Sequence, residues 1–120
     1  MGGPTSGLAD LDSRGSGTGC ASGRVHDLIV SAFGPQGQAQ VDHALEIANR
    51  ESGCNPNAYN DVYVAPYGNA SGVFQILVPG IWEAWSARCG YEGANAFDAE
   101  ANVAVAACVV AEQGWGPWSL

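Results

Sequence analysis

Glu51 is the residue whose position in the sequence best suits acid–base chemistry. It follows a helical pattern at about 38–50 whose apolar face includes Ala44 and Ala48. A helix of 3.6 residues per turn places Glu51 within about 60° of that face, so its carboxyl group should lie on the core-facing side. The negative end of the helix dipole and burial both disfavour the charged form, which suits a general acid. The neighbouring Arg50 would favour the charged form if its guanidinium reached the carboxylate, but we expect its side chain to point elsewhere, since adjacent helix residues face different directions.

Hydrophobic periodicity predicts the helix beside Glu51 and three others. Apolar residues recur at helical spacing in each, and Gly, Pro or Asp residues stand at the expected ends. Between Asn55 and Gly80, turn formers surround a short β-forming run, Asp61 to Val64, and an apolar stretch, Val73 to Leu77, too short for a stable helix. The sequence therefore predicts a mainly α (α+β) domain of about four helices with a small irregular or β-hairpin lobe. The expected helices are about 22–33, 38–50, 79–89 and 98–114.

The charge balance excludes several classes of function. The 120 residues include four arginines, no lysine and 12 acidic residues, for a formal net charge of -8. Because there is no basic patch, neither nucleic acid nor an anionic membrane surface is an expected partner. No apolar run approaches the length of a membrane span. Residues 1–19 are rich in Gly and Ser and are expected to form a flexible leader or linker before one domain at 20–120.

Four cysteines, Cys20, Cys54, Cys89 and Cys108, indicate two disulfides and an oxidising compartment. Four thiols allow three pairings, and their number alone does not choose between them. Cys89 follows the third predicted helix and Cys108 lies in the fourth, so a bridge between them would join two helices. Cys20–Cys54 would then tie the start of the domain to the loop after Glu51. No closely spaced ligand pair is present, so we expect no metal site.

The tryptophans and histidines are expected to have structural roles. Trp82 and Trp85 are three residues apart and share a helix face, which usually means a core position. Trp115 and Trp118 are expected to pack the last turn against the body of the domain. His43 should lie on a solvated helix face.

Three separated segments together resemble one known group of enzymes. They are residues 48–56 (ANRESGCNP) with 58–60 (AYN), residues 70–76 (ASGVFQI), and residues 98–118. They are similar to the lysozyme-like superfamily, specifically to the soluble lytic transglycosylase type domains of actinobacteria and their phages. The last segment also resembles the ending of the resuscitation-promoting factors. In this family a helix ends in a Glu-Ser dipeptide bearing the catalytic acid, and a Gly-x-Phe-Gln string builds the opposite wall of the substrate cleft.

The resemblance implies a lysozyme-like fold with a substrate cleft, and cleavage of peptidoglycan glycan strands. Glu51 would be the general acid that protonates the glycosidic oxygen of the β-1,4 bond between N-acetylmuramic acid and N-acetylglucosamine. It would then act as base on water or on the muramoyl 6-hydroxyl. Gln75 would hydrogen-bond a sugar or its acetamido group, and Ser71 would lie where the backbone approaches the ligand. We further expect a monomer without a cofactor, located outside the cell or at the wall after secretion or phage delivery.

The sequence departs from the family pattern in two places. Residues 101–104 lack the tyrosine of the family's Ala-Tyr-Asn element, and the segment 61–69 is longer than expected. We expect this segment to form a flap over the cleft. Tyr59, Tyr63 or Tyr67 would then supply the missing aromatic hydroxyl or a face on which a sugar stacks.

Asp61 is the candidate for a second carboxylate in the reaction. A separation of about 5 to 9.5 Å from Glu51 would indicate a two-carboxylate hydrolase, whereas a larger one favours chemistry by a single acid. Asp61 also stands in a turn-forming context, where it would have no catalytic part. Both interpretations remain open.

Two other functions compete with glycan cleavage. The first is a Cys/His peptidoglycan endopeptidase that uses Cys54 or Cys20 with His43 or His26, and it requires a free thiol. The second is a glycan-binding or virion structural module that keeps a lysozyme-like shape without cleaving its ligand. A desolvated acid at Glu51 argues against pure binding.

Overall fold

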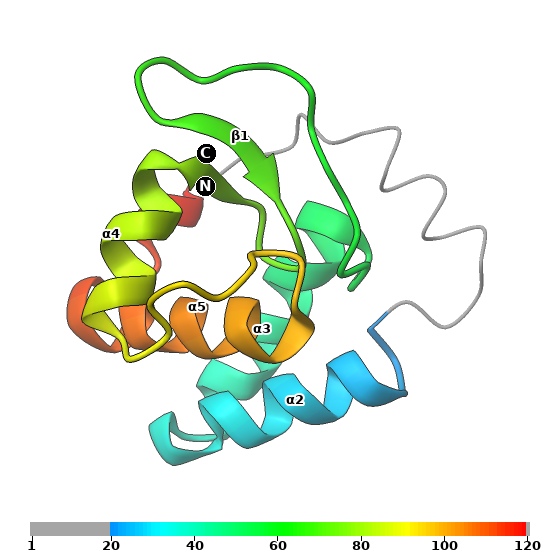
Figure 1. Cartoon of the computed structure of the whole chain (residues 1–120). Helices are drawn as coiled ribbons and strands as arrows, with labels where there is room; N and C mark the ends of the chain where they lie inside the picture. The colour runs from blue at the N-terminus through cyan, green and yellow to red at the C-terminus, as the bar shows by residue number, and fades with distance from the viewer. Residues whose placement is uncertain (1–19, 120) are drawn as a thin grey trace.

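A computed structural model of the protein describes residues 20–119, in which a small hairpin lies at one side of the helices (Figure 1). The predicted leader, residues 1–19, lies outside the described residues. The prediction of a mainly α fold with four helices and a small β lobe is confirmed for the described part. The helices are α2 (Arg24–Phe33), α3 (Gln38–Ser52), α4 (Gly80–Arg88) and α5 (Ala99–Gln113), with the short 3-10 helices η2 (Gly34–Gln36) and η3 (Gly116–Trp118).

Helix α3 extends two residues beyond its predicted end and therefore includes Glu51. Gly53 follows the helix in the left-handed conformation, with φ 64°, which is a common way to end an α-helix. The Gly53 N–H donates to the carbonyl oxygen of Asn49 at 2.9 Å. The last turn of α3 thus has a fixed end, and Glu51 lies within it.

The β lobe lies within the segment 55–80, where the sequence predicts a small irregular or hairpin lobe. Strands β1 (Gly68–Ser71) and β2 (Ile76–Pro79) pair antiparallel, with Ser71 opposite Ile76. The predicted run 61–64 contributes only an isolated bridge between Val64 and Gly68. The predicted apolar stretch 73–77 divides into a tight turn and the start of β2, because those residues, rather than 61–64, find a partner in β1. Residues 53–67 form the long connection that Figure 1 draws from α3 to β1.

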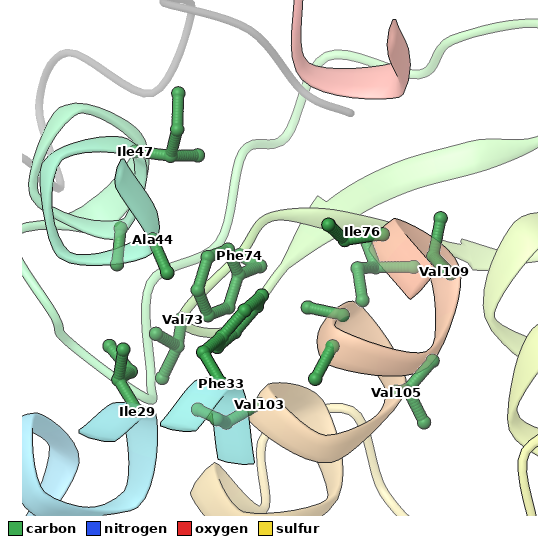
Figure 2. Close-up of a cluster of buried hydrophobic side chains, with 14 of the residues drawn as sticks. Ile29, Phe33, Ala44, Ile47, Val73, Phe74, Ile76, Val103, Val105 and Val109 are labelled. Carbon is green, nitrogen blue, oxygen red and sulfur yellow. The ribbon is translucent and has the colours of Figure 1, made fainter. Parts of the chain in front are cut away.

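The core lies where α2, α3, α5 and the hairpin turn meet. Figure 2 places Phe33 of α2 beside Phe74 of the turn, and their ring centroids are 5.8 Å apart. Helix α5 is buried along most of its length, which suits its Ala- and Val-rich sequence. The Asp98 side chain caps its first turn by accepting a hydrogen bond from the Ala101 N–H at 3.2 Å. The hairpin turn is therefore packed into the core rather than exposed.

Two disulfides hold the elements together, with the pairing that the helix positions predicted. Cys20–Cys54 joins the segment before α2 to the loop after α3. Cys89–Cys108 joins the end of α4 to α5. Two disulfides are compatible with a secreted protein. Among the described residues, no helix has both the length and the apolar character that crossing a membrane requires.

Candidate active site

Glu51 is completely buried in the last turn of α3, with no solvent-accessible surface. The prediction that its side chain projects from the core-facing side of the helix is confirmed, and the side chain is fully rather than partly buried. A buried carboxyl group without charge compensation is strongly unfavourable in its ionised form. The groups next to Glu51 therefore decide its charge state.

Arg50 is one of those groups, and this corrects the expectation that its side chain points away. Its Nη2 lies 2.9 Å from Glu51 Oε2, and its Nε donates to the same oxygen at 3.3 Å. Adjacent Cα–Cβ bonds in a helix point in different directions, but the arginine side chain is long enough to bring its guanidinium to the neighbouring carboxylate. This ion pair stabilises the charged carboxylate. The Arg50 Nη2 also donates to the backbone carbonyl oxygen of Trp118 in η3.

Ser52 fixes the end of α3 to the hairpin turn. Its hydroxyl donates to the carbonyl oxygen of Val73 at 2.7 Å, and the side chain is fully buried. The adjacent carbonyl oxygen of Phe74 accepts a hydrogen bond of 2.8 Å from Trp118 Nε1. The Glu-Ser helix end, the hairpin turn and η3 are therefore joined by side chain to backbone bonds.

Asn102 of α5 holds the same turn from the opposite side. Its Oδ1 accepts from the Phe74 N–H at 2.8 Å, and its Nδ2 donates to the carbonyl oxygens of Ser71 and Ala96 at 3.2 and 2.9 Å. The side chain is fully buried, so each of these bonds replaces one that water would otherwise make. Sequence reasoning missed this residue. The signal that could have found it is an asparagine among the Ala and Val of a buried helix.

Gln75 is also completely buried, at the end of the turn. Its Nε2 donates to the carbonyl oxygens of Ala58 and Gly72, at 3.1 and 3.0 Å. The amide nitrogen thus supports the backbone, and the expected contact with a sugar stays a prediction. Its Oε1 is buried and has no hydrogen-bond partner among the described residues.

Ser71 and Tyr59 lie side by side at the edge of the hairpin. An isolated antiparallel bridge pairs their backbones, so Tyr59 lies next to the last residue of β1. Ser71 is buried, and its hydroxyl donates to the carbonyl oxygen of Asn69 at 3.1 Å. The Tyr59 ring is half exposed and lies 6.3 Å from that of Phe97. Of these two predicted contacts, only the tyrosine is accessible in this conformation.

The connection 59–67 carries most of the exposed large hydrophobic side chains of the described residues. Asp61 is also exposed on it. The Tyr63 hydroxyl donates to the carbonyl oxygen of Pro66 at 3.2 Å, which bends the connection locally. Among residues 20–119, the exposed large hydrophobic side chains other than Val30 are all found here: Tyr59, Val62, Tyr63, Val64 and Tyr67. The connection 59–67, which includes most of the segment 61–69 predicted to be a flap, is thus a tyrosine-rich surface whose only charged residue is Asp61.

Most of the tryptophans lie where the sequence predicts. Trp82 and Trp118 are buried, and Trp115 stacks on Phe33 with ring centroids 5.6 Å apart. His43 differs from its prediction, because its ring packs edge-on against Trp115 at 4.7 Å rather than facing water alone.

A surface pocket of about 450 Å³ lies between the ends of α4 and α5, lined by Trp85, Arg88 and Glu112 among others, without Glu51. Arg88 and Glu112 form a bidentate pair with a shortest distance of 2.6 Å. Hydrogen bonding to Arg88 lowers the pKa of Glu112, and the same bond raises the pKa of Arg88. Nearby Cys89 and Cys108 could approach a metal with Glu112, but their disulfide leaves no thiolate ligand. The pocket is therefore bordered by a paired structural contact.

The cysteine peptidase alternative is contradicted. All four cysteines of the chain fall within the described residues, and all four form disulfides. Neither Cys20 nor Cys54 can then supply the thiolate nucleophile that a Cys/His enzyme needs.

No family model, curated protein or solved structure matches the chain.

Proposed function

We propose that the protein cleaves the glycan strands of peptidoglycan, with Glu51 as the single general acid and base. The bond cut is the β-1,4 linkage between N-acetylmuramic acid and N-acetylglucosamine. The observation that carries this proposal is the buried carboxyl group at the end of α3, beside a hairpin turn that Ser52 ties to the same helix. That arrangement fits the family resemblance of the Glu-Ser and Gly-x-Phe-Gln segments.

The reaction needs Glu51 to change its charge state during the cycle. Once Arg50 moves away, the fully buried carboxyl group favours its protonated form, because desolvation disfavours the charge. The protonated carboxyl donates its proton to the glycosidic oxygen, and the C1–O bond to the leaving sugar breaks. The resulting carboxylate then removes a proton from an oxygen that attacks C1. Water gives a reducing sugar, and the muramoyl 6-hydroxyl gives a 1,6-anhydro sugar.

The tyrosine-rich connection is the proposed contact surface for the strand. Tyr59 and Tyr63 expose aromatic faces of the kind on which sugar rings stack. Asp61 is the only charged residue between Ser52 and Trp82, so this surface repels an anionic polymer less than the rest of a protein of net charge -8 does. Gln75 Oε1 is a buried acceptor that a sugar hydroxyl or acetamido N–H could reach when the site opens. Ser71 borders the same turn.

Mass spectrometry of the fragments released from purified peptidoglycan tests this function. Muramic acid residues at the new ends identify the bond cut. Anhydro ends, lighter by one water molecule than reducing ends, identify the transglycosylase route, and reducing ends identify a muramidase. Absence of any fragment cut at the muramic acid side would contradict the proposal.

The full burial of Glu51 and its pairing with Arg50 favour a second candidate, a non-catalytic glycan-binding or virion structural module. Such a module would bind glycan strands at the tyrosine surface and leave Glu51 covered. Co-sedimentation with insoluble peptidoglycan, without release of fragments, would support this candidate over cleavage.

A further inference from the structure

The structure buries the residue that the proposed reaction requires. A general acid must come within about 3 Å of the oxygen that it protonates. Glu51 has no accessible surface, so no glycosidic oxygen can reach it in this conformation. A structural change must therefore come before the proton transfer.

Arg50 lies where it can control that change. Its Nη2 contacts both the neighbouring Glu51, at 2.9 Å from Oε2, and the carbonyl oxygen of Trp118, which is 68 residues away in the chain. About a third of the arginine side chain is exposed, whereas the Glu51 side chain that it pairs with is fully buried. A ligand arriving from solvent would thus meet the arginine before the carboxylate.

The turn that Arg50 holds begins with glycines, while its Trp118 side chain is buried. Glycines stand on either side of Trp115, at Gly114 and Gly116, and neither has another group close to the position of a side chain. Glycine gives the backbone unusual freedom at both places. The turn is held down by the Trp118 contacts with Phe74, a 2.8 Å hydrogen bond and an edge-on ring contact at 6.0 Å, and by the bond from Arg50.

We propose that Arg50 is a positioning residue that latches Glu51 to the C-terminal turn Gly116–Trp118 and keeps the carboxyl group covered until a glycan strand displaces it. The latch rests on the proposed function for its purpose, but its existence can be tested without substrate. In the closed state the guanidinium keeps the carboxylate charged and inaccessible. Displacement of Arg50 removes the guanidinium from Glu51 and exposes the carboxyl group in one step. The protonated form of Glu51 therefore forms only where a strand is bound.

Chemical labelling of carboxyl groups measures the opening directly. The folded protein is treated with a water-soluble carbodiimide and glycine ethyl ester, and peptide mass mapping gives the rate at which Glu51 is modified. The exposed Glu83 in the same molecule serves as the internal standard. Wild type, Arg50→Gln and Arg50→Lys are compared, and Arg88→Gln is the matched control because it breaks the other arginine–glutamate pair.

The latch predicts that Glu51 is hardly modified in wild type and is modified at least about tenfold faster in Arg50→Gln, since the rate follows the open fraction. Arg50→Lys should lie between them, because one compact ammonium group does not reproduce the fork of donors. Arg88→Gln should leave Glu51 at the wild-type rate. A Glu51 rate in Arg50→Gln equal to that of wild type, or equal to that of Arg88→Gln, would overturn the latch.

Amide hydrogen exchange tests the other half of the latch. The Trp118 and Ser119 N–H groups are bonded within the turn, to the carbonyl oxygens of Trp115 and Gly116. Arg50→Gln should speed their exchange about tenfold and leave the middle of α5 unchanged. Unchanged exchange in the turn would mean that Arg50 does not hold it. Should Arg50→Gln fail to fold, Arg50→Lys decides both measurements: rates above wild type support the latch and rates equal to wild type refute it. Neither measurement contains glycan, so the latch and the proposed cleavage can fail separately.

Discussion

The Ser52 hydroxyl and the Val73 carbonyl oxygen, 21 residues apart in sequence, form a buried hydrogen bond of 2.7 Å. This bond joins the last turn of α3, where Glu51 lies, to the hairpin turn. The helix alone would fix only the direction in which Glu51 leaves the backbone. The link to Val73 also fixes how far the carboxyl group stands from the β lobe, and so couples the candidate acid to the opposite wall of the proposed cleft.

Ser52→Ala should therefore destabilise the protein by about 1–3 kcal/mol, because the buried Val73 carbonyl oxygen loses its partner. Urea denaturation followed by circular dichroism gives the free energy of unfolding. Ser31→Ala, at an exposed position of α2, is the control and should change stability by less than about 0.5 kcal/mol. A Ser52→Ala variant as stable as this control would show that the bond does not hold the two elements.

Gly72→Ala should be more damaging, since the hairpin turn leaves no room for a side chain. A Cβ atom there would lie 2.4 Å from both the Ala96 carbonyl oxygen and Asn102 Nδ2, in a backbone with φ +80°. We expect a loss of about 3–5 kcal/mol, measured in the same denaturation assay. Gly93→Ala is a matched control: φ is +83° and no atom stands within 4 Å, so only the backbone cost of about 1 kcal/mol applies. Equal losses in the two variants would contradict the packing of the turn against Asn102.

Some of this arrangement follows from the sequence, and some does not. The apolar periodicity of α3 and α5 predicts both helices, because one face of each must be buried. It also predicts that Glu51 faces the core. The observed disulfides are the arrangement that the helix positions suggest, while the cysteines alone allow three pairings. These features depend on local pattern, which a single sequence records.

The remaining features depend on partners far apart in the chain. The sequence predicts a small irregular or hairpin lobe between residues 55 and 80, but β propensity does not say which segments will pair, and β1 pairs with residues 76–79 rather than with 61–64. The bonds from Asn102 to the hairpin turn and from Arg50 to Trp118 likewise join positions 28 and 68 residues apart. Side-chain reach and tertiary contact decide such pairs, and neither leaves a periodic signal.

Low pH should weaken the Arg88–Glu112 ion pair that joins α4 to α5. Hydrogen bonding to Arg88 lowers the pKa of Glu112 from its ordinary value of 4.5, so the folded state binds this proton less readily than the unfolded state. The stabilisation is complete above about pH 4.5 and is lost as the pH falls through the lowered value. Glu112→Gln should therefore lessen the fall in melting temperature between pH 5 and pH 3. The effect will be small because the pair is exposed. An unchanged pH dependence would mean that the pair does not contribute.

Moderate salt should raise activity on whole peptidoglycan. The protein carries a formal net charge of -8 and the proposed substrate is anionic, so the two repel at low ionic strength. Raising the salt concentration from about 10 to 150 mM shortens the screening length from about 30 to 8 Å. Initial rates of fragment release across this range, with an uncharged soluble oligosaccharide as the comparison, isolate the effect. Rates on the polymer that fall with salt would contradict long-range repulsion.

Glu51→Gln tests the central claim most directly. The amide keeps the shape of the carboxyl group but cannot donate the proton, so fragment release from purified peptidoglycan should fall by about 10²–10⁴-fold while the circular dichroism spectrum is retained. Asp61→Asn is the control for an exposed carboxylate and should stay within about threefold of wild type if a single acid acts. The measurement is the rate of release of fragments with muramic acid ends, followed by mass spectrometry for the three proteins. A Glu51→Gln variant that releases these fragments at close to the wild-type rate would contradict the account.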